Sequence, residues 1–225
     1  MAQAERLTKP TDGPVSRLIN RRISTRITRM LVRLGVSNPN AVTLFTGALG
    51  VLSALPYLLV DPLMAALAGF LVQLSSILDG VDGEIARMLG RKSRFGAYLD
   101  AVTDRIVDIA SFGFASYAAA LGVGLDAGAS SLLSTLTVSA ALMVSYVHAR
   151  GEASLGTSIQ LLGRLRPWAS RDVRLFLLAV GSLLVPLLSW EALLATLVAV
   201  SIASYTYVAA KTVELWLLWR KGVIG

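Results

Sequence analysis

Long hydrophobic stretches, separated by short polar segments, dominate the pattern of this chain. Six of them approach the roughly 20 apolar residues that a helix needs to cross a bilayer. They cover residues 41–60, 62–79, 97–123, 129–149, 172–190 and 192–217. Hydrophobic residues make up 55% of the 225 positions, which is more than an ordinary soluble domain contains. The pattern predicts an all-α, polytopic membrane protein with six transmembrane helices.

A different pattern fills the N-terminal arm. Between residues 15 and 34, apolar side chains recur at steps of three and four, and arginines lie between them. This spacing predicts a basic amphipathic helix at the membrane interface, whose arginines could anchor it to lipid or contact a substrate. Pro39 predicts the end of this helix and Asn40 the cap of the first span. We therefore expect two parts, a cytosolic arm (residues 1–39) and a six-helix membrane domain (residues 40–225).

Positive charge lies on one side of the predicted spans. Lys and Arg occur in the arm, in the second and fourth loops and in the C-terminal tail, whereas the opposite loops carry only Asp61, Asp126 and Glu191. Because Lys and Arg collect in cytosolic loops, we expect an integral protein of the cell membrane with both termini in the cytosol. The net charge of +7 could also suit nucleic acid, but that requires a soluble basic surface, so no nucleic-acid partner is expected.

Two further absences narrow the function. The chain contains no cysteine, which excludes disulfides and thiolate metal sites. The first 35 residues are basic and lack a compact apolar core that ends in small residues, so we expect no cleavable signal peptide.

Four aspartates interrupt the hydrophobic pattern around the second loop. Asp79 and Asp82 are three residues apart at the end of the second span, and Asp100 and Asp104 are four apart, on one face of the third. Ionisable groups at a membrane segment are costly, and four converging acids repel one another without a cation. Since carboxylates bind hard divalent cations, the pattern predicts a metal site on the cytosolic side. Structural ion pairs with the neighbouring basic residues are the alternative.

The aspartates belong to a longer motif, which resembles the signature of the CDP-alcohol phosphotransferase family at every defining position. It reads Asp79-x-x-Asp82-Gly83-x-x-Ala86-Arg87, then eight residues, then Gly96-x-x-x-Asp100-x-x-x-Asp104. Two weaker elements also resemble the family, Pro39-Asn40-x-x-Thr43 and Ser145-Tyr146-x-x-Ala149-Arg150. The resemblance covers most of the chain.

This resemblance implies an enzyme that moves a phospho-alcohol group from a CDP-alcohol to an acceptor hydroxyl and releases CMP, as in phospholipid biosynthesis. It implies two Mg²⁺ ions, with Mn²⁺ as a substitute, held by the four aspartates, and it makes Asp104 the candidate general base. The implied nucleotide-binding residues are Asn40, Thr43, Asp82, Gly83, Ala86, Arg87 and Gly96. Helix capping would explain Asn40 equally well, and Arg87 could bind diphosphate or brace an aspartate. A homodimer is also implied.

Three arginines at the cytosolic ends of the fourth and fifth spans bear on the acceptor. Guanidinium groups suit phosphate oxygens, so an acceptor phosphate is expected to bind to Arg150, Arg171 and Arg174. The general enrichment of arginine in cytosolic loops is the alternative. Inositol-phosphate-using members of the family have arginines at resembling positions, and residues 9–21 and 171–176 resemble the archaeal di-myo-inositol-phosphate-phosphate synthases.

The preferred hypothesis is therefore transfer from CDP-inositol to inositol 1-phosphate. A lipid donor, CDP-diacylglycerol or CDP-archaeol, is the alternative. Bifunctional members of the family carry a cytidylyltransferase domain in front, for which residues 1–39 leave no room. A cation or proton transporter would also hold carboxylates in a helix bundle, but near the midplane, and a non-catalytic scaffold should have lost a motif aspartate.

Three residues outside these sets have two interpretations each. Asp108 is expected to form a buried ion pair rather than to bind metal, and His148 to be a polar helix cap rather than a phosphate ligand. Gly80 is expected to serve helix packing or a turn.

Overall fold

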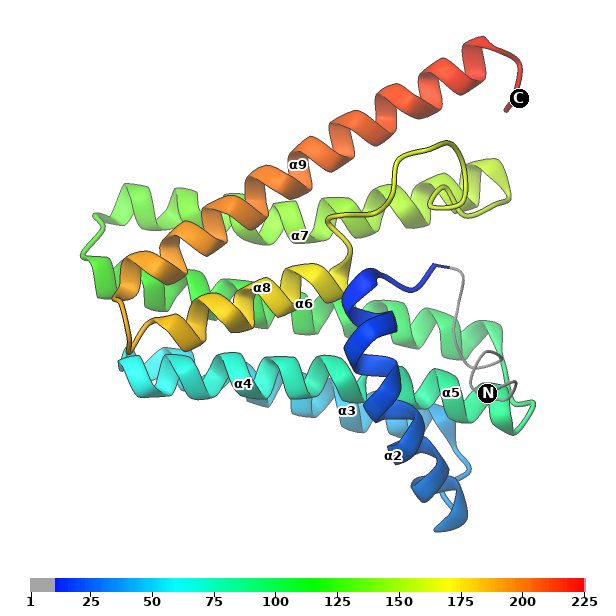
Figure 1. Cartoon of the computed structure of the whole chain (residues 1–225), viewed down its shortest axis with the longest axis horizontal. Helices are drawn as coiled ribbons and strands as arrows, with labels where there is room; N and C mark the ends of the chain where they lie inside the picture. Colours follow the sequence, from blue (N-terminus) through cyan, green and yellow to red (C-terminus); the bar gives the residue numbers. More distant parts are fainter. Residues whose placement is uncertain (1–10, 225) are drawn as a thin grey trace.

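The computed structural model describes residues 11–224, and within that range the chain consists of helices and connecting loops without strands. Figure 1 shows the helices along the chain. In order they are η1 (Ser16–Asn20, π-helical), α2 (Arg21–Arg33), α3 (Pro39–Ala54), η2 (Leu55–Leu59, 3₁₀), α4 (Pro62–Leu78), α5 (Gly80–Met88), α6 (Arg94–Val123), α7 (Ala127–Leu155), α8 (Arg171–Leu184) and α9 (Trp190–Arg220). The all-α class is confirmed.

Five helical segments are long and apolar enough to cross a membrane. They are Pro39–Leu59, Pro62–Met88, Arg94–Val123, Ala127–Leu155 and Trp190–Arg220. Each contains or closely matches one of the predicted stretches, and together they indicate an integral membrane protein.

The expected span over residues 172–190 is a shorter helix, α8, of 14 residues. At 1.5 Å per residue, α8 covers about 21 Å of a hydrocarbon core about 30 Å thick. The helix ends at Leu184, two residues before Pro186, because proline lacks a backbone N–H and disfavours helical geometry in the residue before it. The sixth span therefore stays a prediction.

The helices α3, α4, α6, α7 and α8 run roughly along the long axis of the molecule, and α9 crosses them obliquely (Figure 1). Glycines allow close contact at two crossings. A β-carbon at Gly47 of α3 would clash with Thr103 of α6, and one at Gly69 of α4 would clash with Ser182 of α8. Small residues at such positions let helices pack closely where water provides no driving force.

The arm is helical, as predicted, but its polar side chains make the buried contacts. Ser24 and Thr28 of α2 are buried, and α2 packs on α5. Leu18 and Met30 are exposed to 63% and 54%, so the apolar face remains available to lipid. The interfacial position of this helix stays a prediction.

The junction between the arm and the first span differs from the expectation. Asn38, not Asn40, caps α3, because the Asn38 side-chain oxygen accepts a hydrogen bond from the Ala41 N–H at 3.3 Å. Pro39 is the first residue of α3, where its missing N–H is not needed, whereas α2 has already ended at Arg33. The prediction that Pro39 ends the arm helix is therefore wrong.

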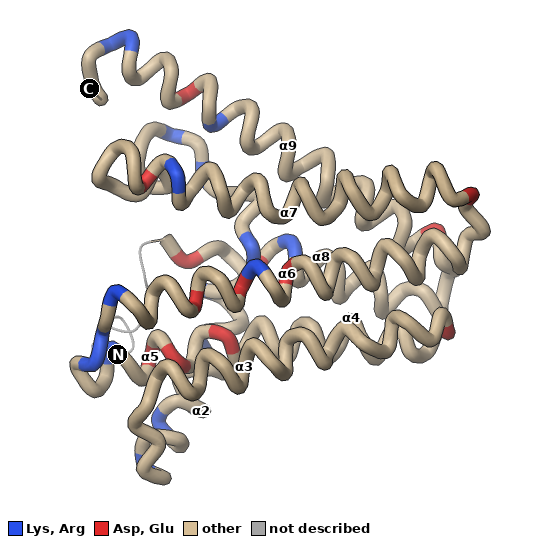
Figure 2. The backbone as a smooth tube through the Cα atoms, turned by 180° about the vertical axis from the view of Figure 1, so that it is seen from behind, with Lys and Arg blue, Asp and Glu red and all other residues tan. Residues whose placement is uncertain are grey.

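Basic residues gather at the end of the bundle that holds both described termini (Figure 2). Acidic positions occur at the opposite end, at the α3–α4, α6–α7 and α8–α9 connections. The basic residues and these acidic positions thus lie at opposite ends of the folded bundle, as the sequence predicted. The assignment of the basic end to the cytosol stays a prediction.

Candidate active site

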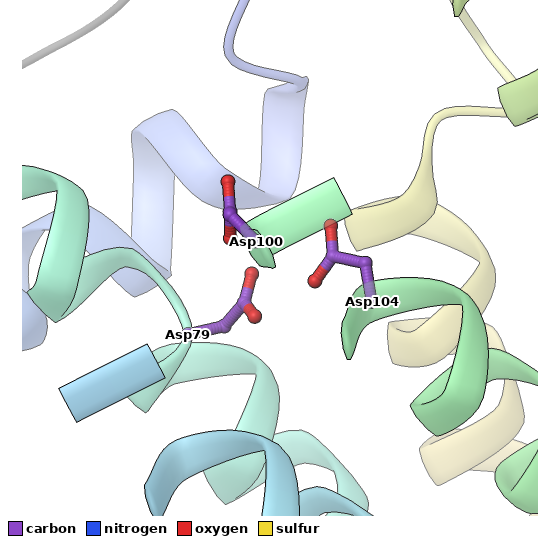
Figure 3. A group of neighbouring side chains, drawn as sticks. All are labelled: Asp79, Asp100 and Asp104. Carbon is purple, nitrogen blue, oxygen red and sulfur yellow. The ribbon is translucent and has the colours of Figure 1, made fainter. Parts of the chain in front are cut away.

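Three of the four motif aspartates converge. Carboxylate oxygens of Asp79, Asp100 and Asp104 lie within 4.8 Å of one another, and Figure 3 shows the three side chains facing a common space. Asp79 lies at the junction of α4 and α5, and the other two lie one turn apart in α6. Close carboxylates repel one another, and their oxygens are the donors that a hard divalent cation prefers. The residues present therefore fit a divalent cation.

Asp82 lies outside this group of three. It is only 6% exposed, and one of its carboxylate oxygens accepts a short hydrogen bond from the Thr43 hydroxyl. The other accepts from the Gly83 N–H. Asp82 nevertheless lines the same cavity as Asp79 and Asp100, so its predicted role as a metal ligand stays a prediction.

A cavity of about 450 Å³, here named the motif pocket, opens on one side of the aspartates. It lies between the starts of α3 and α6 and the length of α5, and it contains all seven predicted nucleotide-binding residues. Its lining is Pro39, Asn40, Thr43, Asp82, Gly83, Ala86, Arg87, Arg91, Lys92, Ser93, Gly96, Ala97 and Asp100. A β-carbon at Gly96 would lie 3.0 Å from the side-chain oxygen of Asn40, so the glycine allows α6 to begin close to α3.

A second cavity of about 430 Å³, here named the arm pocket, adjoins the first. Both cavities are lined by Asp82, Gly83, Arg87 and Asp100. The arm pocket also holds Asp79 and Asp104, and its other walls come from the arm, α4, α7 and α8. The aspartates thus lie where two chemically different cavities meet.

Arg171 is the counter-ion of the converging aspartates. Its Nη1 lies 2.8 Å from Asp79 Oδ2 and 3.0 Å from Asp104 Oδ1, and its Nε donates to Asp108 Oδ1 at 2.8 Å. Burial lowers the pKa of Arg171, but the three carboxylates outweigh burial and raise it well above its usual value. This predicted phosphate-binding residue therefore neutralises the acidic site.

Arg174 lies deeper, with 1% of its surface exposed. Its Nη1 donates to the Ala169 carbonyl at 2.9 Å, and its Nη2 lies 3.5 Å from Asp108 Oδ2. Among the described residues, its Nε and Nη2 have no hydrogen-bond partner. Asp108 is fully buried between the two arginines, which confirms the predicted buried ion pair. Arg150 is exposed and does not line the arm pocket, so its acceptor role stays a prediction.

His148 forms part of the arm-pocket wall and not merely a helix cap. Its Nε2 lies 2.8 Å from the Tyr207 hydroxyl, and Gln160 Nε2 lies 3.0 Å from its Nδ1. These contacts join α7, the α7–α8 loop and α9. The sequence marked His148 as polar, but its partners lie 12 and 59 residues away.

The sequence analysis missed a buried acidic residue on the opposite side of α5 from the motif pocket. Glu84 has no exposed surface and accepts hydrogen bonds from Ser24 at 2.6 Å, Thr28 at 2.9 Å and Arg21 at 3.0 Å. Arg21 also forms two hydrogen bonds to Asp12 at 2.8 and 3.0 Å. Burial lowers the pKa of Arg21, but Asp12 and Glu84 outweigh burial and raise it. Three hydrogen bonds to Glu84, of which the one from Arg21 is also an ion pair, therefore hold the arm on α5.

Two sequence features could have revealed this contact. Ser24 and Thr28 are four residues apart and share a face of α2, and Glu84 lies two residues after Asp82 and so points to a different side of α5. Gly80 completes the contact, since a β-carbon there would lie 2.5 Å from Arg21 Nη1. Its predicted packing role is confirmed.

Residues 36–220 match the model of the CDP-alcohol phosphatidyltransferase family. The chain belongs to this family. This match confirms the family that the motif resembles, and with it the predicted enzyme class, a CDP-alcohol phosphotransferase. It gives no support to the transporter and scaffold hypotheses.

Two curated relatives show where this chain matches known enzymes. It is 37% identical over 177 residues to the bifunctional IPC transferase and DIPP synthase of Archaeoglobus fulgidus, covering 77% of this chain and 33% of that protein. It is 30% identical over 174 residues to the archaetidylinositol phosphate synthase of Pyrococcus horikoshii, covering 73% of this chain and 84% of that protein. The chain thus spans only about a third of the length of the bifunctional relative.

Solved structures of the phosphatidylinositol phosphate synthase of Mycobacterium tuberculosis share the fold. The complex with CDP-DAG superposes with a TM-score of 0.69 and 28% identity, covering 87% of this chain and 94% of that one. A second structure of that enzyme contains manganese and citrate (TM-score 0.67, 27% identity, covering 86% of this chain and 89% of that one). That enzyme therefore binds a divalent metal and a CDP-linked donor.

Proposed function

We propose that this chain transfers a phospho-alcohol group from a CDP-alcohol to a hydroxyl of inositol 1-phosphate and releases CMP, with Mg²⁺ as the cofactor and Mn²⁺ as a substitute. The observation that supports this proposal is that Asp100 lines both the motif pocket and the arm pocket and lies within 4.8 Å of Asp79 and Asp104 in the arm pocket. A nucleotide in the first cavity and an acceptor in the second would meet at these carboxylates.

The motif pocket suits the CMP half of the donor. Asn40 and Thr43 offer polar groups at the start of α3, and Arg87, Arg91 and Lys92 add positive charge for the diphosphate. Gly83 and Gly96 keep the backbone close to the cavity.

Asp79, Asp82, Asp100 and Asp104 would hold the metal. Bound there, divalent ions would neutralise the diphosphate and the departing CMP. Asp104 is proposed as the general base. Its carboxylate takes the proton of the acceptor hydroxyl, while the oxygen of that hydroxyl bonds to the phosphorus on the alcohol side of CDP. The bond from that phosphorus to the CMP oxygen breaks, so no covalent enzyme intermediate is needed.

The arm pocket suits an acceptor that carries a phosphate. Arg174 has N–H groups without partners among the described residues, and buried guanidinium groups bind phosphate oxygens strongly. Arg171 and His148 lie in the same wall. Two of the relatives are named as inositol phosphate synthases, which favours inositol 1-phosphate as the acceptor.

For the donor we favour CDP-inositol, in line with the DIPP synthase relatives. The alternative is CDP-diacylglycerol or CDP-archaeol, since the solved neighbour binds CDP-DAG.

We further propose that the basic end of the bundle, with the active site and both termini, faces the cytosol, and that the protein acts in the cell membrane as a homodimer. The one-sided basic charge supports the orientation (Figure 2), and the family resemblance supports the dimer.

The test is CMP release by the purified full chain with Mg²⁺, inositol 1-phosphate and either CDP-inositol or CDP-diacylglycerol. Phosphorus NMR of the product would show a new phosphodiester that retains the phosphate of the acceptor. Release of CMP that is independent of inositol 1-phosphate, or absence of release with every CDP-alcohol, would overturn the proposal.

A further inference from the structure

The arm pocket has two walls of different chemistry. The wall from α6 and α8 is ionic, with Arg105, Arg171 and Arg174 around Asp104 and Asp108. The wall from the arm and α4 carries neutral hydroxyl and amide groups, from Thr11, Ser16, Asn20, Ser24 and Ser76. The charged residues on that side, Asp12 and Arg21, form an ion pair of 2.8 Å with each other.

The neutral wall reaches the metal-site aspartates directly. Ser76 lies three residues before Asp79 in α4 and so one turn from it on the same side of the helix. Asn20, 5% exposed, donates from Nδ2 to the Ser76 hydroxyl at 3.3 Å and to the Ser76 carbonyl at 3.4 Å. Both residues line the cavity beside Asp79.

A third residue fixes the orientation of Asn20. Gln73 Nε2 donates to Asn20 Oδ1 at 3.2 Å, which leaves the Asn20 amide hydrogens on the side of Ser76. Gln73 Oε1 is buried and has no partner among the described residues. Burying an amide within a membrane segment costs free energy. The linked side chains of Asn20, Gln73 and Ser76, where η1 meets α4, therefore call for a ligand or a structural role.

We propose that Asn20 and Ser76 bind the polyhydroxylic alcohol of the donor and select a CDP-polyol over a CDP-lipid. This inference rests on the proposed function and decides between its two donors. An uncharged polyol presents many hydroxyl groups, which amide and hydroxyl side chains can pair. An acyl chain placed against the Ser76 hydroxyl, which Asn20 holds in position, would remove water from it and offer no hydrogen bond in return, which is unfavourable.

The arrangement also separates the two substrates by charge. The phosphate of the acceptor belongs at the arginine wall, and the neutral alcohol of the donor belongs at the Asn20 wall, with the aspartates between them. Sites built to hydrogen-bond a substrate hydroxyl discriminate strongly against analogues that lack it. Gln73 would then be a positioning residue, since it acts through Asn20.

The test measures kcat/KM of the full chain with inositol 1-phosphate and three donors: CDP-inositol, CDP-glycerol and dioctanoyl CDP-diacylglycerol. We expect CDP-inositol to be the best donor of the wild type. Asn20→Leu and Ser76→Ala should each lower kcat/KM for CDP-inositol by about tenfold, chiefly through KM, and leave the CDP-diacylglycerol value unchanged or higher. The matched control is Ser75→Ala, because Ser75 is buried beside Gly50 on another face of α4.

A binding measurement gives a second readout without turnover. The Kd of CDP-inositol should rise in Asn20→Leu, whereas the Kd of CMP, which lacks the alcohol, should not change. Equal losses with all three donors would make the Asn20–Ser76 contact a structural link only and overturn the inference. A wild-type preference for CDP-diacylglycerol would overturn it while leaving the family activity intact. Absence of CMP release from any donor would overturn the proposed function, and the comparison of Kd values would still decide whether Asn20 binds the polyol.

Discussion

The motif pocket and the arm pocket lie on either side of the same aspartates but are built differently. All residues that line the motif pocket fall between positions 39 and 100, on α3, α5, α6 and the loop between α5 and α6. The arm pocket takes residues from position 11 to position 174, on six α-helices, the π-helical η1 and the loops. The first cavity is thus encoded locally, whereas the second exists only when the arm and α8 are docked. Substrate differences among relatives should therefore arise in the arm pocket.

The two cavities also differ in how their positive charges are used. Arg87, Arg91 and Lys92 line the motif pocket. In the described part of the chain, none of them forms an ion pair with the two converging carboxylates that line only the arm pocket. In the arm pocket, Arg171 already pairs with three carboxylates, and of the two α8 arginines only Arg174 has N–H groups without a hydrogen-bond partner among the described residues. An acceptor phosphate would therefore bind first to Arg174, while Arg171 becomes available once another cation neutralises the aspartates.

The largest effect should come from the aspartates that are proposed to hold the metal without acting as the base. Asp100→Asn, Asp82→Asn and Asp79→Asn should each lower kcat by roughly 10³-fold or more, because metal stabilisation of transition-state charge amounts to several kcal/mol and about 1.4 kcal/mol corresponds to tenfold. The measurements are CMP release across a magnesium titration and direct binding of Mn²⁺. Near-normal turnover in two of these variants would end the proposal of a shared metal site.

A smaller and more selective effect is expected at Asp104, which lines the arm pocket only. Asp104→Asn retains the shape of the side chain but cannot accept the acceptor's proton at neutral pH. We expect kcat to fall by about 10²–10⁴, while the Kd of the CDP-alcohol, measured with Mg²⁺, changes little. If affinity and kcat fall together, Asp104 is chiefly a metal ligand and the base lies elsewhere.

The acceptor side can be separated from the nucleotide side at Arg174. Arg174→Ala should raise the KM for inositol 1-phosphate by about 10–100-fold, because a lost charge-assisted hydrogen bond costs about 1.5–3 kcal/mol, and the donor KM should stay near the wild-type value. Arg174→Lys, which keeps the charge but not the fork, should be intermediate. Equal changes in both KM values would indicate a general loss of folding.

Arg150→Ala tests how far the clamp extends. Arg150 is exposed outside the arm pocket, so an effect on the acceptor KM as large as that of Arg174→Ala would show that α7 or its loop moves when the acceptor binds. An unchanged KM would limit the clamp to α8.

Most of the motif pocket could be predicted, because its residues belong to sequence motifs that resemble those of the family, at Pro39–Thr43 and at Asp79–Asp104. The i, i+4 spacing of Asp100 and Asp104 alone fixes their common face, and hydrophobic length alone predicted the helices. The end of α8 and the cap at Asn38 depend on single residues, Pro186 and Pro39, whose effects on a helix are local and do not change the hydrophobic pattern.

The arm pocket could not be predicted in this way. The pairing of Arg171 with Asp79 joins residues 92 positions apart, and the link from Asn20 to Ser76 joins residues 56 apart. Such contacts depend on the packing of whole helices, for which the sequence shows only isolated polar residues. Thus His148 and Asp108 were recognised as polar positions, but Glu84 and Asn20 were missed.

The smallest expected effect concerns the docking of the arm itself. Glu84→Gln keeps the size of the side chain but removes the charge that Ser24, Thr28 and Arg21 stabilise, which should weaken arm docking by about 1.5–3 kcal/mol. Trypsin should then cleave within α2 about tenfold faster or more, since local opening limits cleavage. Undocking of the arm should open the arm pocket but leave the motif pocket unchanged. The KM for the acceptor should therefore rise while the Kd of CMP stays constant. Glu191→Gln at the opposite end of the bundle is the matched control. Unchanged cleavage in Glu84→Gln would show that packing of α2, and not the buried carboxylate, holds the arm in place.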